Sequence, residues 1–161
     1  MSVFLFTDGS VNPQNGVGFG AVLKFSTDLE FENVNDLRDL LKIKRFENTS
    51  STVLELQTLL WALSEISERE IVSYTDSQNI LSLLSRKERL VKNGFVSRSG
   101  KLVRNHLLYK EFFVAIEGRN IVFNQVSGHM PSGRRHGVNE FFALVDRASR
   151  NALRTDSKAG L

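Results

Sequence analysis

The sequence contains no cysteine among its 161 residues. This absence excludes disulfide bonds, zinc–thiolate sites and thiol nucleophiles. Only two prolines interrupt the chain and 41% of its residues are hydrophobic, so a packed globular domain is expected rather than a disordered segment. A chain of this length can bury a core of its own. We expect residues 1–154 to form a single domain and residues 155–161 to form a flexible tail.

Long apolar runs are also missing. The first apolar run, residues 3–6, is too short for the core of a signal peptide, and no basic region precedes it. No stretch approaches the length that spans a membrane. We therefore expect a cytoplasmic protein with no membrane partner, and because nothing in the sequence demands an assembly, we expect a monomer.

The net charge of +3 is small but unevenly distributed. Residues 86–110, called the basic segment below, hold eight basic residues and one acidic residue, whereas the rest of the chain is acidic overall. A basic block beside an acidic body is typical of a surface that binds a polyanion such as nucleic acid. A solvated helix face gives the same pattern, so the basic segment alone does not decide between the two.

Hydrophobic periodicity and turn signals predict an α/β fold. Strands are expected at 3–7, 18–25, 41–46, 71–75 and 121–126. Helices are expected at 34–41, 52–68, 76–84, 102–117 and 139–153. The first three strands have no long helix between them, which favours antiparallel pairing, and the last two follow helices, which favours parallel pairing. We expect a mixed five-stranded sheet, three antiparallel strands then two parallel, flanked by helices.

Four carboxylates lie where such a fold concentrates chemistry. Asp8 and Asp76 are each placed at the carboxyl end of a predicted strand, where α/β sheets bind ligands. Glu55 lies near the start of an apolar helix and Asp146 lies inside the last helix. Four acids at one sheet edge repel one another unless cations bind there, and oxygen ligands favour Mg²⁺ or Mn²⁺.

Each of the four acids also has a purely structural alternative. Asp8 and Asp76 could begin Asx turns or cap helices. Glu55 lies three residues after Thr52, the spacing of a capping box, and Asp146 lies four residues before Arg150, the spacing of a helical ion pair. Taken singly, none of these residues decides between a structural and a catalytic role.

Five sequence blocks stand out along the chain: FLFTDGS with the turn and GFGAVL that follow it, SSTVLELQTLLWAL, IVSYTDSQNI, NQVSGHMPSG and VDRASRNAL. Together these blocks resemble the RNase H family. The blocks occur in family order and cover nearly the whole chain. The basic segment lies where the cellular type 1 branch carries a basic protrusion, so the chain is similar to that branch. The resemblance implies an RNase H-like domain over residues 1–154, with an acidic insertion near residues 26–40.

The resemblance implies an endonuclease that hydrolyses the RNA strand of RNA–DNA hybrids by two-metal-ion catalysis, leaving 5′-phosphate and 3′-hydroxyl ends. It implies two Mg²⁺ ions, which Mn²⁺ can replace, held by four catalytic carboxylates: Asp8, Glu55, Asp76 and Asp146. His129 matches the catalytic histidine that the family carries in the loop before the last helix. His136 is the rival candidate in the same loop.

The resemblance and the charge pattern together give an expected set of substrate contacts. Gln78 is expected to reach the minor groove of the hybrid, where 2′-hydroxyls distinguish RNA from DNA. Ser51 and Thr52 stand where the family often has asparagines. The full expected set is Gly9, Ser10, Asn12, Ser51, Thr52, Gln78, Lys92, Arg98, Lys101 and Arg104.

Two other functions fit parts of the pattern. A related superfamily nuclease acting on DNA junctions or other structured nucleic acid uses similar carboxylates. A hybrid-binding module without catalysis needs only the basic surface. The DGS, DSQ and GH contexts together favour RNase H, and a cleavage assay on matched duplexes separates the three.

Overall fold

The centre of the protein is a five-stranded sheet. The computed structural model describes residues 1–126 and 136–159. The sheet consists of β1 (Ser2–Asn12), β2 (Val17–Ser26), β3 (Lys42–Phe46), β4 (Glu70–Thr75) and β5 (Asn120–Gln125), in the order β3-β2-β1-β4-β5. β1 and β2 pair antiparallel, as do β2 and β3, whereas β4 pairs parallel with β1 and with β5. The predicted mixed sheet is confirmed.

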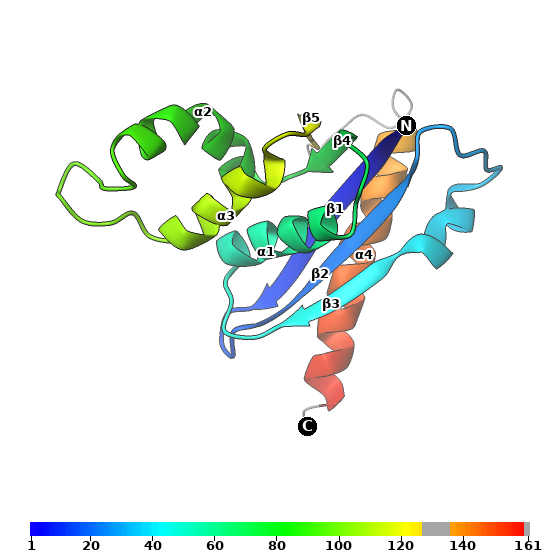
Figure 1. Cartoon of the computed structure of the whole chain (residues 1–161). Coiled ribbons are helices and arrows are strands. Elements are labelled where there is room, and N and C mark those ends of the chain that lie inside the picture. The colour runs from blue at the N-terminus through cyan, green and yellow to red at the C-terminus, as the bar shows by residue number, and fades with distance from the viewer. Residues whose placement is uncertain (127–135, 160–161) are drawn as a thin grey trace.

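Helices cover the two faces of this sheet (Figure 1). α1 (Ser51–Ser64) packs on one face together with α2 (Gln78–Lys92) and α3 (His106–Ile116), and α4 (His136–Ala159) packs on the other. Within the described ranges, none of the helices combines the length and the apolar character that crossing a bilayer requires.

The acidic segment 26–40 contributes to the core. It contains the 3₁₀ helix η1 (Val34–Leu40), which is capped by Asn33 and buries Leu37 beside β2 and α4. The insertion is therefore more than a longer hairpin, because it extends the apolar cluster under α4.

Alternation along the strands divides the core between the two faces. Leu5 of β1 and Ile71 of β4 are buried beneath α1, α2 and α3. Phe6 points to the opposite face, where its ring stacks on Tyr74 with centroids 4.8 Å apart. Phe141 of α4 meets the Phe6 ring edge-on at 5.3 Å. These aromatic contacts fix α4 against β1 and β4.

α1 approaches the sheet closely because glycines leave room for it. A Cβ atom on Gly20 would lie 2.2 Å from Thr58 Oγ1, and one on Gly9 would lie 2.9 Å from Leu54 Cδ2. Only glycine fits where a helix meets a strand backbone this closely. Glu55 lies on the same helix, so this packing sets how near its carboxylate comes to the sheet.

Three of the predicted element boundaries that differ from the structure belong to β1, α2 and α3. β1 continues past residue 7 to Asn12 because it keeps its pairing with β2. α2 runs to Lys92 rather than about residue 84, because Leu90 continues its buried stripe. α3 begins at His106 rather than residue 102, because Asn105 has a φ of 65°, which a right-handed helix does not continue through.

α1 and α4 also differ from the prediction at their ends. α1 ends at Ser64 rather than residue 68. Its cap is Ser50, whose Oγ accepts a hydrogen bond from the N–H of Val53 at 3.4 Å. Thr52 is therefore not the cap, and the capping box that its spacing to Glu55 offered as a structural alternative is not the arrangement observed.

α4 begins at His136 rather than residue 139 and continues to Ala159, past the predicted end at residue 153. The helix therefore runs into the segment expected to be a tail. Arg45 of β3 pairs there with Asp156, with Nε and Oδ1 3.3 Å apart, and this contact ties the end of α4 to the sheet.

Replacing Gly20 by alanine is expected to lower the free energy of unfolding by about 1–3 kcal/mol, because the new methyl group overlaps Thr58. Urea denaturation measures the change. Thr58→Ala removes the overlapping atoms, so the double variant is expected to lose less than the sum of the two single losses. Additive losses would contradict the close contact between α1 and β2.

Candidate active site

The candidate site lies where β1 and β4 stop pairing. Their parallel ladder ends at Phe6 and Tyr74, and Asp8 and Asp76 each follow two residues later in the chain. Asp8 therefore lies within β1, opposite Ala21 of β2, and not at the end of the strand as predicted. Asp76 directly follows β4, which ends at residue 75. The two aspartates occupy matching positions at the opening between the strands.

Glu55 and Asp146 reach the same place from the helices. Glu55 of α1 lines a small hollow with Asp8, Asp76 and three threonines. Asp146 of α4 lies near enough to Asp8 to raise the pKa of that carboxyl. The fold thus brings the four predicted carboxylates together from β1, α1, the end of β4 and α4.

Burial and like charge raise the pKa values of three of these carboxylates. Burial, followed by the charge of Asp76, raises the pKa of Asp8 from 3.8 to about 8, and Asp146 adds to the rise. Burial and the charge of Asp76 raise the pKa of Glu55, against a hydrogen bond from Ser77. Partial burial and the charge of Asp146 raise the pKa of Asp76. The cluster therefore retains protons at pH values where isolated carboxylates are already ionised.

Ser77 positions Glu55 and is a site residue that sequence reasoning missed. Its Oγ donates to Glu55 Oε2 at 2.6 Å and accepts from the N–H of Ile80 at 3.2 Å. Ser77 is therefore the cap of α2, a role that the sequence also allowed for Asp76. The carboxylate of Asp76 remains with the cluster. The available signal was the position of a serine directly before a helix.

Arg150 pairs with Asp146 along α4. Its Nε donates to Asp146 Oδ1 at 3.0 Å, and Nη2 contacts Oδ2. The ion pair with Arg150, which the spacing offered as the structural alternative for Asp146, forms. Asp146 nevertheless also lies near enough to Asp8 to raise its pKa, so the ion pair does not take it out of the cluster. A cation at the site therefore competes with Arg150 for this carboxylate.

The carboxylate oxygens of the site are ligands of the kind that a hard divalent cation prefers. In residues 1–126 and 136–159, no group of three or more His, Cys, Asp and Glu side chains is arranged to hold a metal ion as the side chains stand. All four converging side chains nevertheless offer carboxylate oxygens, the ligands that Mg²⁺ prefers. Burial and like-charge repulsion raise the pKa of Asp8 because both disfavour its ionised form. A bound cation stabilises that ionised form.

Six of the predicted substrate residues lie within four positions of one of the carboxylates along the chain. Ser10 Oγ lies 3.0 Å from Ser149 Oγ and joins β1 to α4, and Asn12 Oδ1 accepts from the N–H of Gln14 in the turn after β1. Gln78 is exposed at the start of α2. The six are Gly9, Ser10 and Asn12 on β1, Ser51 and Thr52 on α1, and Gln78.

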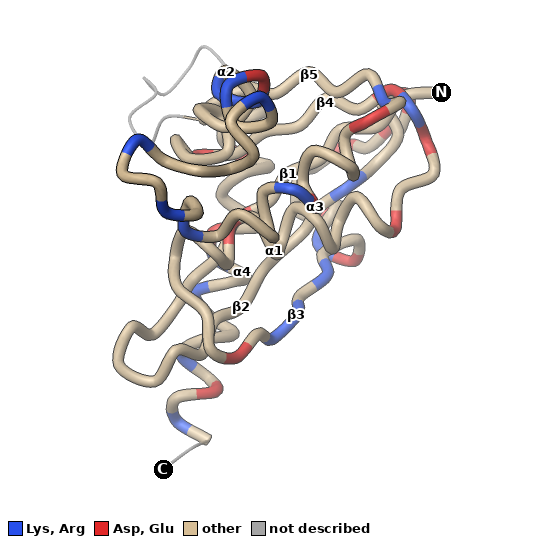
Figure 2. The backbone as a smooth tube through the Cα atoms, turned by 60° about the vertical axis from the view of Figure 1, so that its left-hand side comes forward, with Lys and Arg blue, Asp and Glu red and all other residues tan. Residues whose placement is uncertain are grey.

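The other four predicted substrate residues lie apart from the carboxylates. They are exposed at the end of α2 and on the loop that leads to α3, where basic residues recur along the chain (Figure 2). His129 lies outside the described residues, and His136 is the first residue of α4. The four basic residues are Lys92, Arg98, Lys101 and Arg104.

The pKa of Asp8 gives the metal-free protein a specific pH dependence. Because the folded state raises this pKa to about 8, its protonation supports folding at low pH, and that support is lost as the pH rises through about 8. We expect the melting temperature in EDTA to fall between about pH 4 and pH 8 and to level off above that range. Asp8→Asn is expected to flatten this fall and to raise the melting temperature at pH 8 by a few degrees.

Circular dichroism measures the melting temperature across this range. Asp39→Asn, which removes an exposed carboxylate of η1, is the matched control and is expected to behave as the wild type. If the melting temperatures of Asp8→Asn and Asp39→Asn fell equally with rising pH, the repulsion assigned to the carboxylate cluster would be contradicted.

Comparisons with known proteins identify the family and the fold of this chain. Ribonuclease H of Clostridium botulinum is 25% identical over 158 residues, covering 94% of this chain and 95% of that protein. The solution structure of the PFV RNase H domain superposes with a TM-score of 0.71, at 18% identity and over 92% of both chains. LC9-RNase H1, described as a type 1 RNase H with the type 2 active-site motif, gives a TM-score of 0.66 at 20% identity, over 94% of this chain and 71% of that one. The RNase H family model matches residues 1–157, and the chain belongs to the RNase H family.

Proposed function

We propose that this nuclease of the RNase H family hydrolyses the RNA strand of RNA–DNA hybrids and leaves 5′-phosphate and 3′-hydroxyl ends. The observation that carries the proposal is the convergence of Asp8, Glu55, Asp76 and Asp146 in a chain whose family match spans residues 1–157. Holding mutually repelling carboxylates together is unfavourable. A module that only binds hybrids has no use for that arrangement.

The same four carboxylates are proposed to hold two Mg²⁺ ions, or Mn²⁺ in their place. When bound, such ions activate a water molecule for in-line attack on the phosphodiester and stabilise the 3′-oxygen that leaves. Ser77 orients Glu55 through its short hydrogen bond, and Arg150 orients Asp146. These two residues act as positioning residues for the carboxylates.

The surface around the carboxylates is proposed to hold the hybrid. Gln78 is exposed at the first turn of α2, close in the chain to Asp76, and is proposed to reach the minor groove and its 2′-hydroxyls. The hydroxyls of Ser51 and Thr52 at the start of α1 can donate to phosphate or 2′-hydroxyl oxygens. The basic segment is proposed to contact the phosphates of the hybrid.

A cleavage assay on three matched duplexes tests the proposal. RNA–DNA, RNA–RNA and DNA–DNA duplexes of one sequence are incubated with the protein and Mg²⁺ or Mn²⁺. We expect cleavage of the RNA strand of the hybrid alone, and none after EDTA removes the metal. Cleavage of DNA junctions instead would favour the related nuclease, and hybrid binding without cleavage would favour the binding module.

Asp8→Asn and Asp76→Asn are each expected to reduce hybrid cleavage to the background rate, because a neutral amide replaces a proposed metal ligand of the same size. Circular dichroism is expected to show an intact fold in both variants. Asp39→Asn serves as the control with the same chemical change and is expected to keep full turnover. Wild-type turnover in either site variant would refute the catalytic assignment.

Lys101→Gln combined with Arg104→Gln is expected to weaken hybrid binding and to reduce its salt dependence. Each lost phosphate contact lowers the slope of log K against log salt by about 1. Fluorescence anisotropy measures the slope. The double variant Arg154→Gln, Lys158→Gln removes the same charge from exposed positions on α4 and is expected to leave the slope unchanged. Equal slopes in all three proteins would exclude the basic segment as a phosphate contact.

A further inference from the structure

Ser149 is a fully buried serine of α4, three residues after Asp146. Residues three apart on a helix lie on one face, so Ser149 and Asp146 are neighbours on α4. A buried hydroxyl is unfavourable unless it forms hydrogen bonds, and Ser149 forms two. Ser73 of β4 differs, because its buried Oγ has no hydrogen-bond partner among residues 1–126 and 136–159.

The two hydrogen bonds of Ser149 run in one direction. Its Oγ lies 3.1 Å from the carbonyl oxygen of Asp146 and 3.0 Å from Ser10 Oγ. A hydroxyl carries one proton and a carbonyl oxygen only accepts, so Ser149 donates to Asp146 and accepts from Ser10. A chain of hydrogen bonds therefore runs from β1 through Ser149 into the backbone of α4.

Ser10 lies two residues after Asp8 on β1. Side chains two residues apart on a strand point to the same face, so both residues share the face of the sheet that α4 covers. β1 and α4 meet there through three pairs in the same order along both elements: Phe6 with Phe141, Asp8 with Asp146, and Ser10 with Ser149. The aspartate pair, whose charges repel, therefore lies between two attractive contacts.

The serine pair is the more directional of these two attractive contacts. Aromatic rings attract one another over a range of offsets, whereas a hydrogen bond weakens steeply as its distance and angle change. Because Ser149 and Asp146 share one face of α4, a shift or rotation of α4 that separates Asp146 from Asp8 also breaks the bond to Ser10. The serine pair therefore fixes α4 at the position where the aspartates are close.

We propose that Ser149 is a positioning residue that sets the distance between the carboxylates of Asp8 and Asp146. Residues that orient metal ligands through hydrogen bonds change metal affinity and turnover without touching the metal. The inference rests on the proposed function, because it gives the serine pair a purpose in metal binding at the same site. Ser149 itself, being buried, does not contact the hybrid.

Mn²⁺ binding tests the proposal without nucleic acid. Isothermal titration calorimetry compares the wild type with Ser149→Ala, and we expect the Kd for Mn²⁺ to rise about fivefold because one neutral hydrogen bond is lost. Ser73→Ala is the matched control, since it also deletes a buried hydroxyl but breaks no hydrogen bond among the described residues. It is expected to change the Kd by less than about twofold.

A conservative variant separates positioning from stability. Ser149→Thr keeps the hydroxyl and adds a methyl group at a buried position, so we expect a lower melting temperature but a Kd for Mn²⁺ within about twofold of the wild type. Ser149→Ala is expected to lose affinity even if its melting temperature is the higher of the two. Equal loss of affinity in both variants would assign the effect to packing and overturn the proposal.

Cleavage kinetics give a second readout. At subsaturating Mn²⁺, Ser149→Ala is expected to lower kcat about fivefold and to leave the KM for the RNA–DNA hybrid within about twofold of the wild type. Adding Ser10→Ala to Ser149→Ala is expected to lower kcat no further, because the bond is already lost. Additive losses would show that the two hydroxyls act independently, which contradicts the proposal.

The results distinguish this inference from the proposed function. A wild type that binds Mn²⁺ but leaves the hybrid intact refutes the proposed function, while a higher Kd in Ser149→Ala still supports the positioning role. A wild type that cleaves the hybrid, with equal Kd and kcat in Ser149→Ala and Ser73→Ala, overturns the positioning role alone. A wild type that binds no Mn²⁺ overturns both.

Discussion

Beyond Phe6 and Tyr74, β1 and β4 no longer pair, and the two aspartates that follow face the opening between them. A continuous sheet separates the helices on its two faces. Here the opening lets Glu55 from α1 and Asp146 from α4 approach the same aspartates, although these helices pack on opposite faces. The site therefore depends on where one ladder of hydrogen bonds ends.

Packing around that opening keeps the four carboxylates close together, although their charges repel one another. On one face, the glycines of β1 and β2 admit α1 to within contact of the strand backbone. On the other, Phe141 of α4 meets the stacked rings of Phe6 and Tyr74. Buried apolar area stabilises these contacts, and like-charge repulsion among the carboxylates opposes them. The raised pKa of Asp8 is one result of this opposition.

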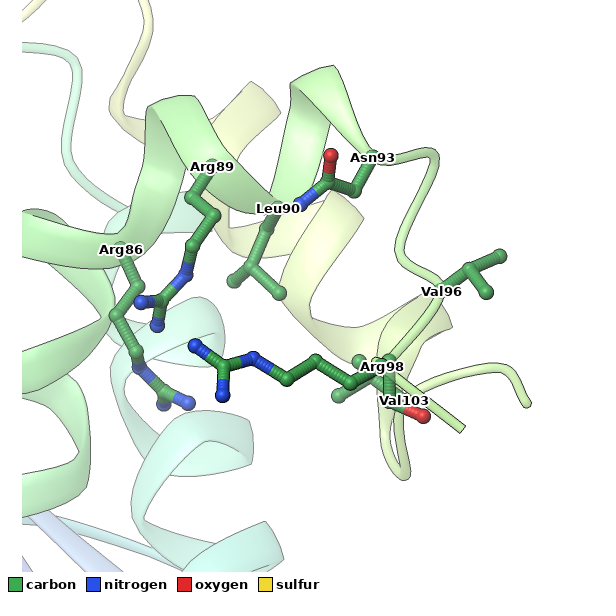
Figure 3. Close-up of a pocket in the computed structure, with 8 residues that line it drawn as sticks. Arg86, Arg89, Leu90, Asn93, Val96, Arg98 and Val103 are labelled. Carbon is green, nitrogen blue, oxygen red and sulfur yellow. The ribbon is translucent and has the colours of Figure 1, made fainter. Parts of the chain in front are cut away.

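The sheet and the meeting of the carboxylates were predictable because they depend on strand alternation, connection length and motifs in order along the chain. The extent of α2 was not, since basic residues around Leu90 concealed the apolar stripe that continues the helix. The contact between Ser77 and Glu55 joins residues far apart in the sequence, and no local pattern reveals it. The hollow lined by Arg86, Arg89 and Arg98 likewise depends on a loop that folds back toward α2 (Figure 3). The catalytic and substrate roles stay predictions.

α2 is unbroken from Gln78, which follows the carboxylate site, to Lys92 in the basic segment. With a rise of about 1.5 Å per residue, Arg86 lies about 12 Å along the helix axis from Gln78. A helix keeps this spacing whatever binds at either end. α2 therefore sets a fixed distance between the candidate active site at its first turn and the basic segment at its far end.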